Sequence, residues 1–154
     1  MKSTKKVETK LQQESEEILN KGDIDGLKYI EFLPDQKVVK QISGWEKYSE
    51  LDRLIIDVKN ANFSFFRDNA EILNTFCEEL ISTIPKGMNT PQINSRVIVL
   101  QTKLFKLESV VGLSNVNKKE LLESVKELLI AFSNLNLQMN KKVEKESQNI
   151  RKPN

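Results

Sequence analysis

The sequence contains no histidine and only one cysteine among its 154 residues. The absence of histidine excludes catalytic pairs in which imidazole activates serine or cysteine, and it excludes histidine-ligated zinc and di-iron sites. A single cysteine can form neither an internal disulfide nor a metal site made of several thiolates. An enzyme would have to rely on carboxylates and lysines, so we expect a non-enzymatic protein without cofactor or metal.

Glycine and proline are also scarce, with five and four residues. A sandwich of short strands needs more turn residues than this, and no segment keeps the apolar–polar alternation of a strand. Apolar runs are only a few residues long, such as 97–100, so no segment is long enough to span a bilayer. We therefore expect an all-α fold without a transmembrane segment.

Charge is nearly balanced, with 24 basic and 22 acidic residues. Nucleic-acid-binding proteins gather basic residues, arginine above all, on one face, and most basic residues here are lysine, so we expect no nucleic-acid partner. Segment 41–85 has four basic and eight acidic residues, whereas 86–113 has four and one, and 114–154 has eight and five. This asymmetry favours packing of the acidic segment against the basic ones, with opposite charges at the edges of their contact. The alternative is a basic face that binds an acidic partner.

Helical periodicity is clearest in 91–111, where apolar residues recur every three or four positions. Thr90 can cap the start of this helix, and Pro91 fits its first turn, where a backbone N–H is not needed. We expect Gly112 to end the helix in the left-handed conformation. A second helix is expected over 116–147, with a cap at its start.

The cap expected for the helix at 116–147 is Asn117, with Glu120 as its capping-box partner. A third helical pattern covers 43–84 and ends before Pro85. Its middle contains three phenylalanines and three asparagines, which interrupt the apolar stripe of the helix. We favour one continuous or slightly kinked helix, and the alternative is a break near Asn62 to Ser64.

Three such helices predict an up-down antiparallel bundle, because the connections at 85–90 and 112–116 are short. N-terminal helical material is expected to fill a fourth position. The chain then divides into a tether or weak helix at 1–22, a bundle domain at 23–148 and a flexible tail at 149–154.

The helix at 116–147 is longer than its neighbour, so the far end of its apolar stripe lacks a partner within the hairpin. An exposed stripe predicts self-association or binding of another protein. The stripe consists of Leu137, Met139 and Val143. Coverage by residues 24–45 of the same chain is an equally good interpretation, because that segment has enough apolar side chains.

A second candidate surface is formed by Phe63, Phe65 and Phe66. Neighbouring phenylalanines on a helix cannot all face one seam, so at least one is expected outside the core. This group predicts either a patch for a protein partner or a pocket for a small apolar ligand or lipid. The function expected first is an interaction or structural module, and a carrier of an apolar ligand is the alternative.

Charged residues near the reversal at 85–90 predict a structural ion pair. Arg96 follows that reversal by about two helical turns, so we expect it to reach Glu78 or Glu79 on the preceding helix.

Cys77 is expected to be a buried small hydrophobe, because the two adjacent glutamates disfavour a reactive thiolate.

Two groups of acidic residues have the side-chain types of a metal site. The segment 20–32 has Asp23 and Asp25 in a calcium-loop arrangement, but Lys21 and Phe32 occupy positions that need oxygen ligands, so a turn capped by Asp is favoured. The other group has lysines beside it and is expected to form local ion pairs. It consists of Glu120, Glu123 and Glu127.

Segments 84–103 and 130–147 resemble uncharacterised, helical, predicted lipoproteins of Gram-negative bacteria. The resemblance covers about 45–147 and depends on the turn containing Pro85, Thr90 and Pro91, together with Arg96. It implies an all-helical fold and attachment to the cell envelope, and it implies no activity.

The start of the chain bears on location. Residues 1–10 are basic, but no apolar core follows them and no lipid-acceptor cysteine lies nearby. A cytoplasmic protein without an export signal is therefore the expectation from the residues. The resemblance implies the periplasmic face of the envelope instead, if a lipoprotein signal has been removed.

Overall fold

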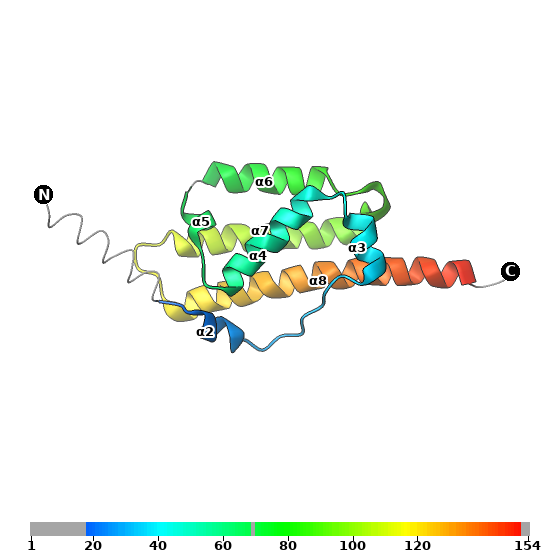
Figure 1. Cartoon of the computed structure of the whole chain (residues 1–154). Coiled ribbons are helices and arrows are strands. Elements are labelled where there is room, and N and C mark those ends of the chain that lie inside the picture. The colour runs from blue at the N-terminus through cyan, green and yellow to red at the C-terminus, as the bar shows by residue number, and fades with distance from the viewer. Residues whose placement is uncertain (1–17, 69, 152–154) are drawn as a thin grey trace, which may run out of the picture.

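The computed structural model describes residues 18–68 and 70–151, which form seven α-helices, one 3-10 turn and no strand (Figure 1). The all-α expectation is thereby confirmed for this part of the chain. Most of the segment expected as a tether lies outside the described residues. The elements are α2 (Lys21–Asp25), α3 (Gln36–Ile42), α4 (Glu46–Lys59), α5 (Ser64–Asp68), α6 (Ala70–Ser82), the 3-10 turn Lys86–Met88, α7 (Pro91–Val111) and α8 (Lys118–Arg151).

The centre of the molecule is a long hairpin, in which α7 and α8 lie side by side and run in opposite directions (Figure 1). Its caps are the predicted ones: Thr90 accepts a hydrogen bond from the backbone N–H of Ile93, and Asn117 accepts one from that of Lys119. The seam between the helices is lined by buried apolar side chains. It includes Ile93, Val97, Leu100, Leu104 and Leu107 of α7 and Leu121, Val125, Leu128, Leu135 and Met139 of α8.

The ends of the hairpin helices differ in two details from the sequence prediction. Gly112 ends α7 with φ −78°, so the left-handed stop expected there is wrong. Its N–H still bonds to the carbonyl of Glu108, which means that the residue completes the last turn in right-handed geometry. At the other end, α8 continues to Arg151, so residues 149–151 of the expected tail are helical.

The continuous helix favoured over 43–84 is wrong, because the chain breaks into α4, α5 and α6. At the first break Ala61 has a left-handed φ of 60°, a conformation that costs an alanine about 1–2 kcal/mol. Asn62 then accepts hydrogen bonds from the N–H and hydroxyl of Ser64, as the alternative prediction of a cap there required. The break turns the chain back, so that α6 runs opposite to α4 (Figure 1).

Both α4 and α6 pack against the hairpin. Tyr48 of α4 stacks on Phe132 of α8 with ring centroids 5.7 Å apart. On α6, the carbonyl of Cys77 accepts a hydrogen bond of 2.7 Å from Gln101 of α7. Cys77 is 4% exposed, as predicted for a small core residue, and burial, with a smaller contribution from Glu108, raises the pKa of its thiol to about 12.

Candidate functional site

An extended segment at 27–35, which we call the strap, runs alongside α8 and is held there by three side chains of that helix (Figure 1). Ser133 accepts a hydrogen bond from the N–H of Phe32 at 2.7 Å and donates one to the carbonyl of Ile30 at 2.8 Å. Asn136 donates to the carbonyl of Phe32 at 3.0 Å. Side chains of α8 therefore satisfy backbone groups that a strand partner would satisfy in a sheet.

The third side chain, Asn140, donates to the carbonyl of Leu33 and accepts from the N–H of Asp35, at 2.9 and 2.8 Å. The strap leads into α3, whose Val38 and Ile42 are buried. The strap and α3 thus lie along the half of α8 where an exposed stripe was expected.

That expectation is not met, because Met139 is 0% and Val143 7% exposed, while Leu137 is half-buried. The other interpretation, coverage by 24–45 of the same chain, agrees with these contacts. A docking surface centred on Met139 therefore lacks the exposed apolar area that it requires.

The phenylalanine group is divided between core and surface. Phe63 and Phe66 are buried, whereas Phe65 is half-buried and contacts Phe66 and Phe76 edge-to-face, with centroid distances of 5.4 and 6.2 Å. Phe65 lines a groove that includes neither Phe66 nor Phe132. A deep cavity lined by Phe65, Phe66 and Phe132 would favour a carrier of apolar ligands. The groove beside Phe65 is not such a cavity.

The groove beside Phe65 lies between α4 and α6, has a volume of about 420 Å³ and is largely open to solvent. We call it the α4–α6 groove. Its apolar surface comes from Phe65, Ile72 and Phe76, and Ile72 is 49% exposed. Its remaining lining is polar: Lys47, Glu50, Glu71, Thr75 and Glu79.

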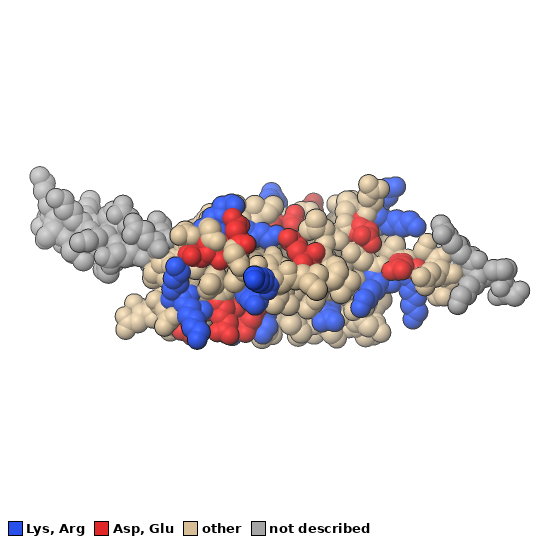
Figure 2. Space-filling view, turned by 90° about the horizontal axis from the view of Figure 1, so that it is seen from below, with Lys and Arg blue, Asp and Glu red and all other residues tan. Residues whose placement is uncertain are grey.

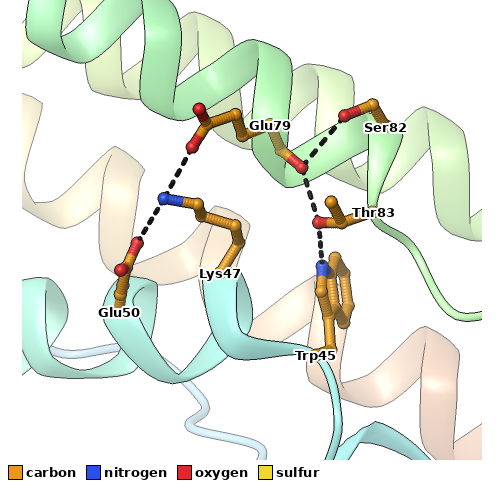
Figure 3. A network of polar contacts seen from close by, with 6 residues as sticks. All are labelled: Trp45, Lys47, Glu50, Glu79, Ser82 and Thr83. Carbon is orange, nitrogen blue, oxygen red and sulfur yellow. Dashed lines mark hydrogen bonds and ion pairs between the residues drawn. The ribbon is translucent and has the colours of Figure 1, made fainter.

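Lys47 joins the two helices that form the walls. Its ammonium lies 2.6 Å from the carboxylate of Glu79 on α6 and 2.9 Å from that of Glu50 on its own helix (Figure 3). It also lies 6.0 Å from the ring centroid of Phe76, within cation–π range. The hydrogen bond with Glu79, and then that with Glu50, raises the pKa of Lys47.

A second set of contacts fixes the same two helices to each other. The indole of Trp45 donates a 3.1 Å hydrogen bond to the hydroxyl of Thr83, which in turn donates to the carbonyl of Glu79 (Figure 3). Ser82 donates to that carbonyl as well. These hydrogen bonds and the burial of Trp45 fix α4 against α6. The walls of the groove are therefore held in place without a ligand.

The ion pairs of the groove bear on the chemistry that Lys47 can perform. A lysine nucleophile must lose its proton near neutral pH, whereas the carboxylates around Lys47 keep it protonated. Among the described residues, no three His, Cys, Asp or Glu side chains lie close enough to hold a metal ion. In the same part of the chain, no helix has the length and apolar character needed to cross a membrane.

The ion pair predicted for Arg96 is wrong. Glu79 pairs with Lys47 instead, while Arg96 is exposed and forms no ion pair within 18–68 and 70–151. The pairing with Lys47 could not be found from a continuous helix over 43–84, because it requires α6 to fold back along α4. The i,i+3 spacing of Lys47 and Glu50 was the only local signal.

Asp23 and Glu127, which belong to the two acidic groups with side-chain types of a metal site, have other partners in the structure. Asp23 forms a capping box with Asn20 at the start of α2, and its pKa is lowered mainly by the backbone N–H of Asn20. Glu127 pairs with Lys106 at 2.6 Å and Lys103 at 3.8 Å, both on α7, and not with lysines of its own helix. Its ion pairs thus connect the two helices of the hairpin.

Comparisons with protein-family models, with curated proteins and with solved structures found no match to this chain. The resemblance to predicted lipoproteins therefore remains an interpretation of the sequence. What the chain does is inferred from its surface chemistry.

Proposed function

We propose that this protein is a non-enzymatic helical module that binds a basic amphipathic helix of a partner protein in the α4–α6 groove. The observation that supports the proposal is the open apolar surface of Phe65, Ile72 and Phe76 bordered by charged side chains. An amphipathic helix that docks in a groove inserts apolar side chains spaced three or four residues apart. Ile72 is the groove residue that such a helix would cover most.

The charge of the groove selects the kind of helix. Three glutamates and one lysine line it, which gives a formal charge of −2. Because Lys47 is shared by Glu50 and Glu79, these three side chains alone carry a formal charge of −1, and a further cation is favoured over a further anion. A partner helix with lysine or arginine beside its apolar face would complement this border.

A preformed groove suits this role, since binding then requires little reordering of the protein. We infer that the arrangement behind it is an up-down antiparallel bundle in which α4, α6, α7 and α8 alternate in direction. In this arrangement the hairpin supports the two helices that form the groove.

A carrier of a small apolar ligand is the second candidate, and the edge-to-face pair of Phe65 and Phe76 favours it. Ligand sites for such molecules usually enclose most of the ligand surface. The α4–α6 groove is open, so a small apolar ligand would stay largely in contact with water. A partner helix, in contrast, closes the groove itself.

Three synthetic peptides of equal length test the proposal: a Leu/Lys amphipathic helix, a Leu/Glu amphipathic helix and a scrambled Leu/Lys sequence without an apolar face. We expect only the first to bind, measured by fluorescence anisotropy with the full chain. Ile72→Ser should weaken that binding roughly tenfold, the effect of losing one buried aliphatic contact.

The matched control is Ile98→Ser, because Ile98 is 52% exposed on α7 and lies outside the groove. Equal weakening by both substitutions would show that the peptide binds apolar surface in general and would contradict the proposal. Binding of a fatty acid that Ile72→Ser abolishes, without peptide binding, would establish the carrier instead.

A further inference from the structure

A second groove, of about 370 Å³, lies between the first turn of α7 and the C-terminal part of α8. It shares no lining residue with the α4–α6 groove. Its charge comes from Lys141, Lys142, Lys145 and Glu146, which gives a formal charge of +2, and Gln92 and Gln138 add amide groups. We call it the α7–α8 groove.

The lysines of this groove are not equally neutralised. Lys142 pairs with Glu146 one turn along α8. Lys141 and Lys145 are exposed and form no ion pair within the described residues, in contrast to Lys103 and Lys106 farther along the hairpin. Like charges four residues apart on a helix repel each other, so a bound anion between them would remove a local repulsion.

Nothing on the opposite wall offsets these charges, because the first turn of α7 contains no acidic residue. Basic side chains also predominate on the face shown in Figure 2 towards the C-terminal end of α8, whereas basic and acidic side chains are mixed nearer to α2. On this face, the excess of positive charge is therefore greatest towards the C-terminal end of α8.

We propose that the α7–α8 groove binds an acidic, extended segment of a partner protein, with carboxylates on alternate residues contacting Lys141 and Lys145. Side chains at i and i+4 of a helix are about 6 Å apart. Alternate residues of an extended chain are about 6.6 Å apart, which matches that spacing. The amides of Gln92 and Gln138 can donate further hydrogen bonds to the carboxylates or the backbone of the segment.

The lining favours this occupant over other polyanions. Among the described side chains that line the groove, none is large and apolar enough to insert into a bilayer, and the surface is concave. The same described lining contains no arginine, the residue that nucleic-acid sites favour. An acidic peptide needs neither feature.

The test uses the full chain and a fluorescein-labelled peptide of alternating glutamate and glycine, with a glutamine-for-glutamate peptide as the uncharged control. At low salt we expect the acidic peptide alone to bind, and Lys141→Gln with Lys145→Gln should weaken it roughly fivefold to tenfold. Lys28→Gln with Lys119→Gln removes the same charge from exposed lysines outside the groove, which form no ion pair with another described residue, and should change affinity less than about twofold.

Three results would overturn the proposal: no binding of the acidic peptide, equal weakening by the two double variants, or lysine-dependent binding only to phosphatidylcholine vesicles that contain phosphatidylglycerol. The last result would assign the groove to an anionic lipid surface. Circular dichroism of each variant checks that the helices are intact. Because Ile72→Ser leaves this groove unchanged, it should not affect binding of the acidic peptide, so the two proposals can fail separately.

Discussion

Two regions of the molecule differ in how their backbone is fixed. In the α7–α8 hairpin, caps at Thr90 and Asn117 begin the helices, and a continuous apolar seam joins them. In the part from α2 to α6, helices are shorter and polar side chains of the hairpin bond to their backbone. Asn136 bonds to the carbonyl of Phe32 in the strap, and Gln101 bonds to the carbonyl of Cys77 within α6.

The difference shows that residues close in sequence determine the structure of the hairpin. The structure of the part from α2 to α6 depends instead on contacts with the surface of the hairpin. In the middle of the strap, the backbone groups of Ile30, Phe32 and Leu33 bond to side chains of α8, so they depend on Ser133, Asn136 and Asn140. We therefore expect substitutions in the hairpin seam to destabilise the whole chain, and substitutions of these polar residues to act first on the strap.

The largest effect is expected for Leu100→Ala in the middle of the seam. Leu100 is fully buried, and a cavity of this kind costs about 2–5 kcal/mol of the free energy of unfolding. Urea denaturation measures the loss. Ile98→Ala on the exposed face of the same helix should cost less than about 0.5 kcal/mol, and a similar loss from both would contradict a stabilising seam.

Asn136→Ala should have the next largest effect. Asn136 is buried, accepts a 2.6 Å hydrogen bond from the hydroxyl of Tyr48 and donates to the carbonyl of Phe32, so its loss leaves a buried hydroxyl and a part-buried carbonyl unpaired. We expect a loss of about 1–3 kcal/mol in urea denaturation, together with faster amide hydrogen exchange at Phe32.

The matched control for that prediction is Asn140→Ala. Asn140 also bonds to the strap, but its hydrogen bonds are exposed, so water can replace it and the loss should be smaller. If both substitutions cost the same, burial would not be what makes Asn136 important.

The smallest effect concerns pH and the ion pairs across the hairpin. The hydrogen bond with Lys106, and then the charge of Lys103, lowers the pKa of Glu127. A carboxyl group whose pKa is lower in the folded state stabilises the protein above its unfolded pKa of about 4.3, and the stabilisation is lost as the pH falls through the folded pKa.

Glu127→Gln should therefore lower the free energy of unfolding at pH 7 by less than about 1 kcal/mol, and the difference should be smaller at pH 3. Thermal unfolding at the two pH values measures it. Glu123→Gln, at an exposed position without an ion pair in the described part of the chain, should show no pH-dependent difference. An equal pH dependence in both variants would assign the effect to net charge alone.

The same division explains which features could be predicted from the sequence. Thr90, Pro91 and Asn117 act on backbone groups within three residues of themselves, so the helix starts were found from local spacing. The seam was found because apolar periodicity needs no knowledge of the partner. The all-α fold follows from these two kinds of signal.

The strap and the α4–α6 groove could not be found in this way. Ser133 and Asn136 look like solvent-facing residues of a helix, and their partners lie more than one hundred positions earlier in the chain. Likewise, Lys47 meets Glu79 only because Ala61 adopts a left-handed conformation that its residue type does not favour. In both cases tertiary contacts override the local preference.

The burial of Cys77 has a consequence for the covalent state of the protein. Only a thiolate attacks a disulfide or a peroxide, and a thiol with a pKa of about 12 and 4% exposure supplies almost none at neutral pH. Since this is the only sulfhydryl group in the chain, we expect the thiol of the folded protein to stay reduced in oxidising and reducing surroundings alike. A disulfide-linked dimer on a gel would therefore record molecules that had opened around α6, and it would say nothing about association of the native chain.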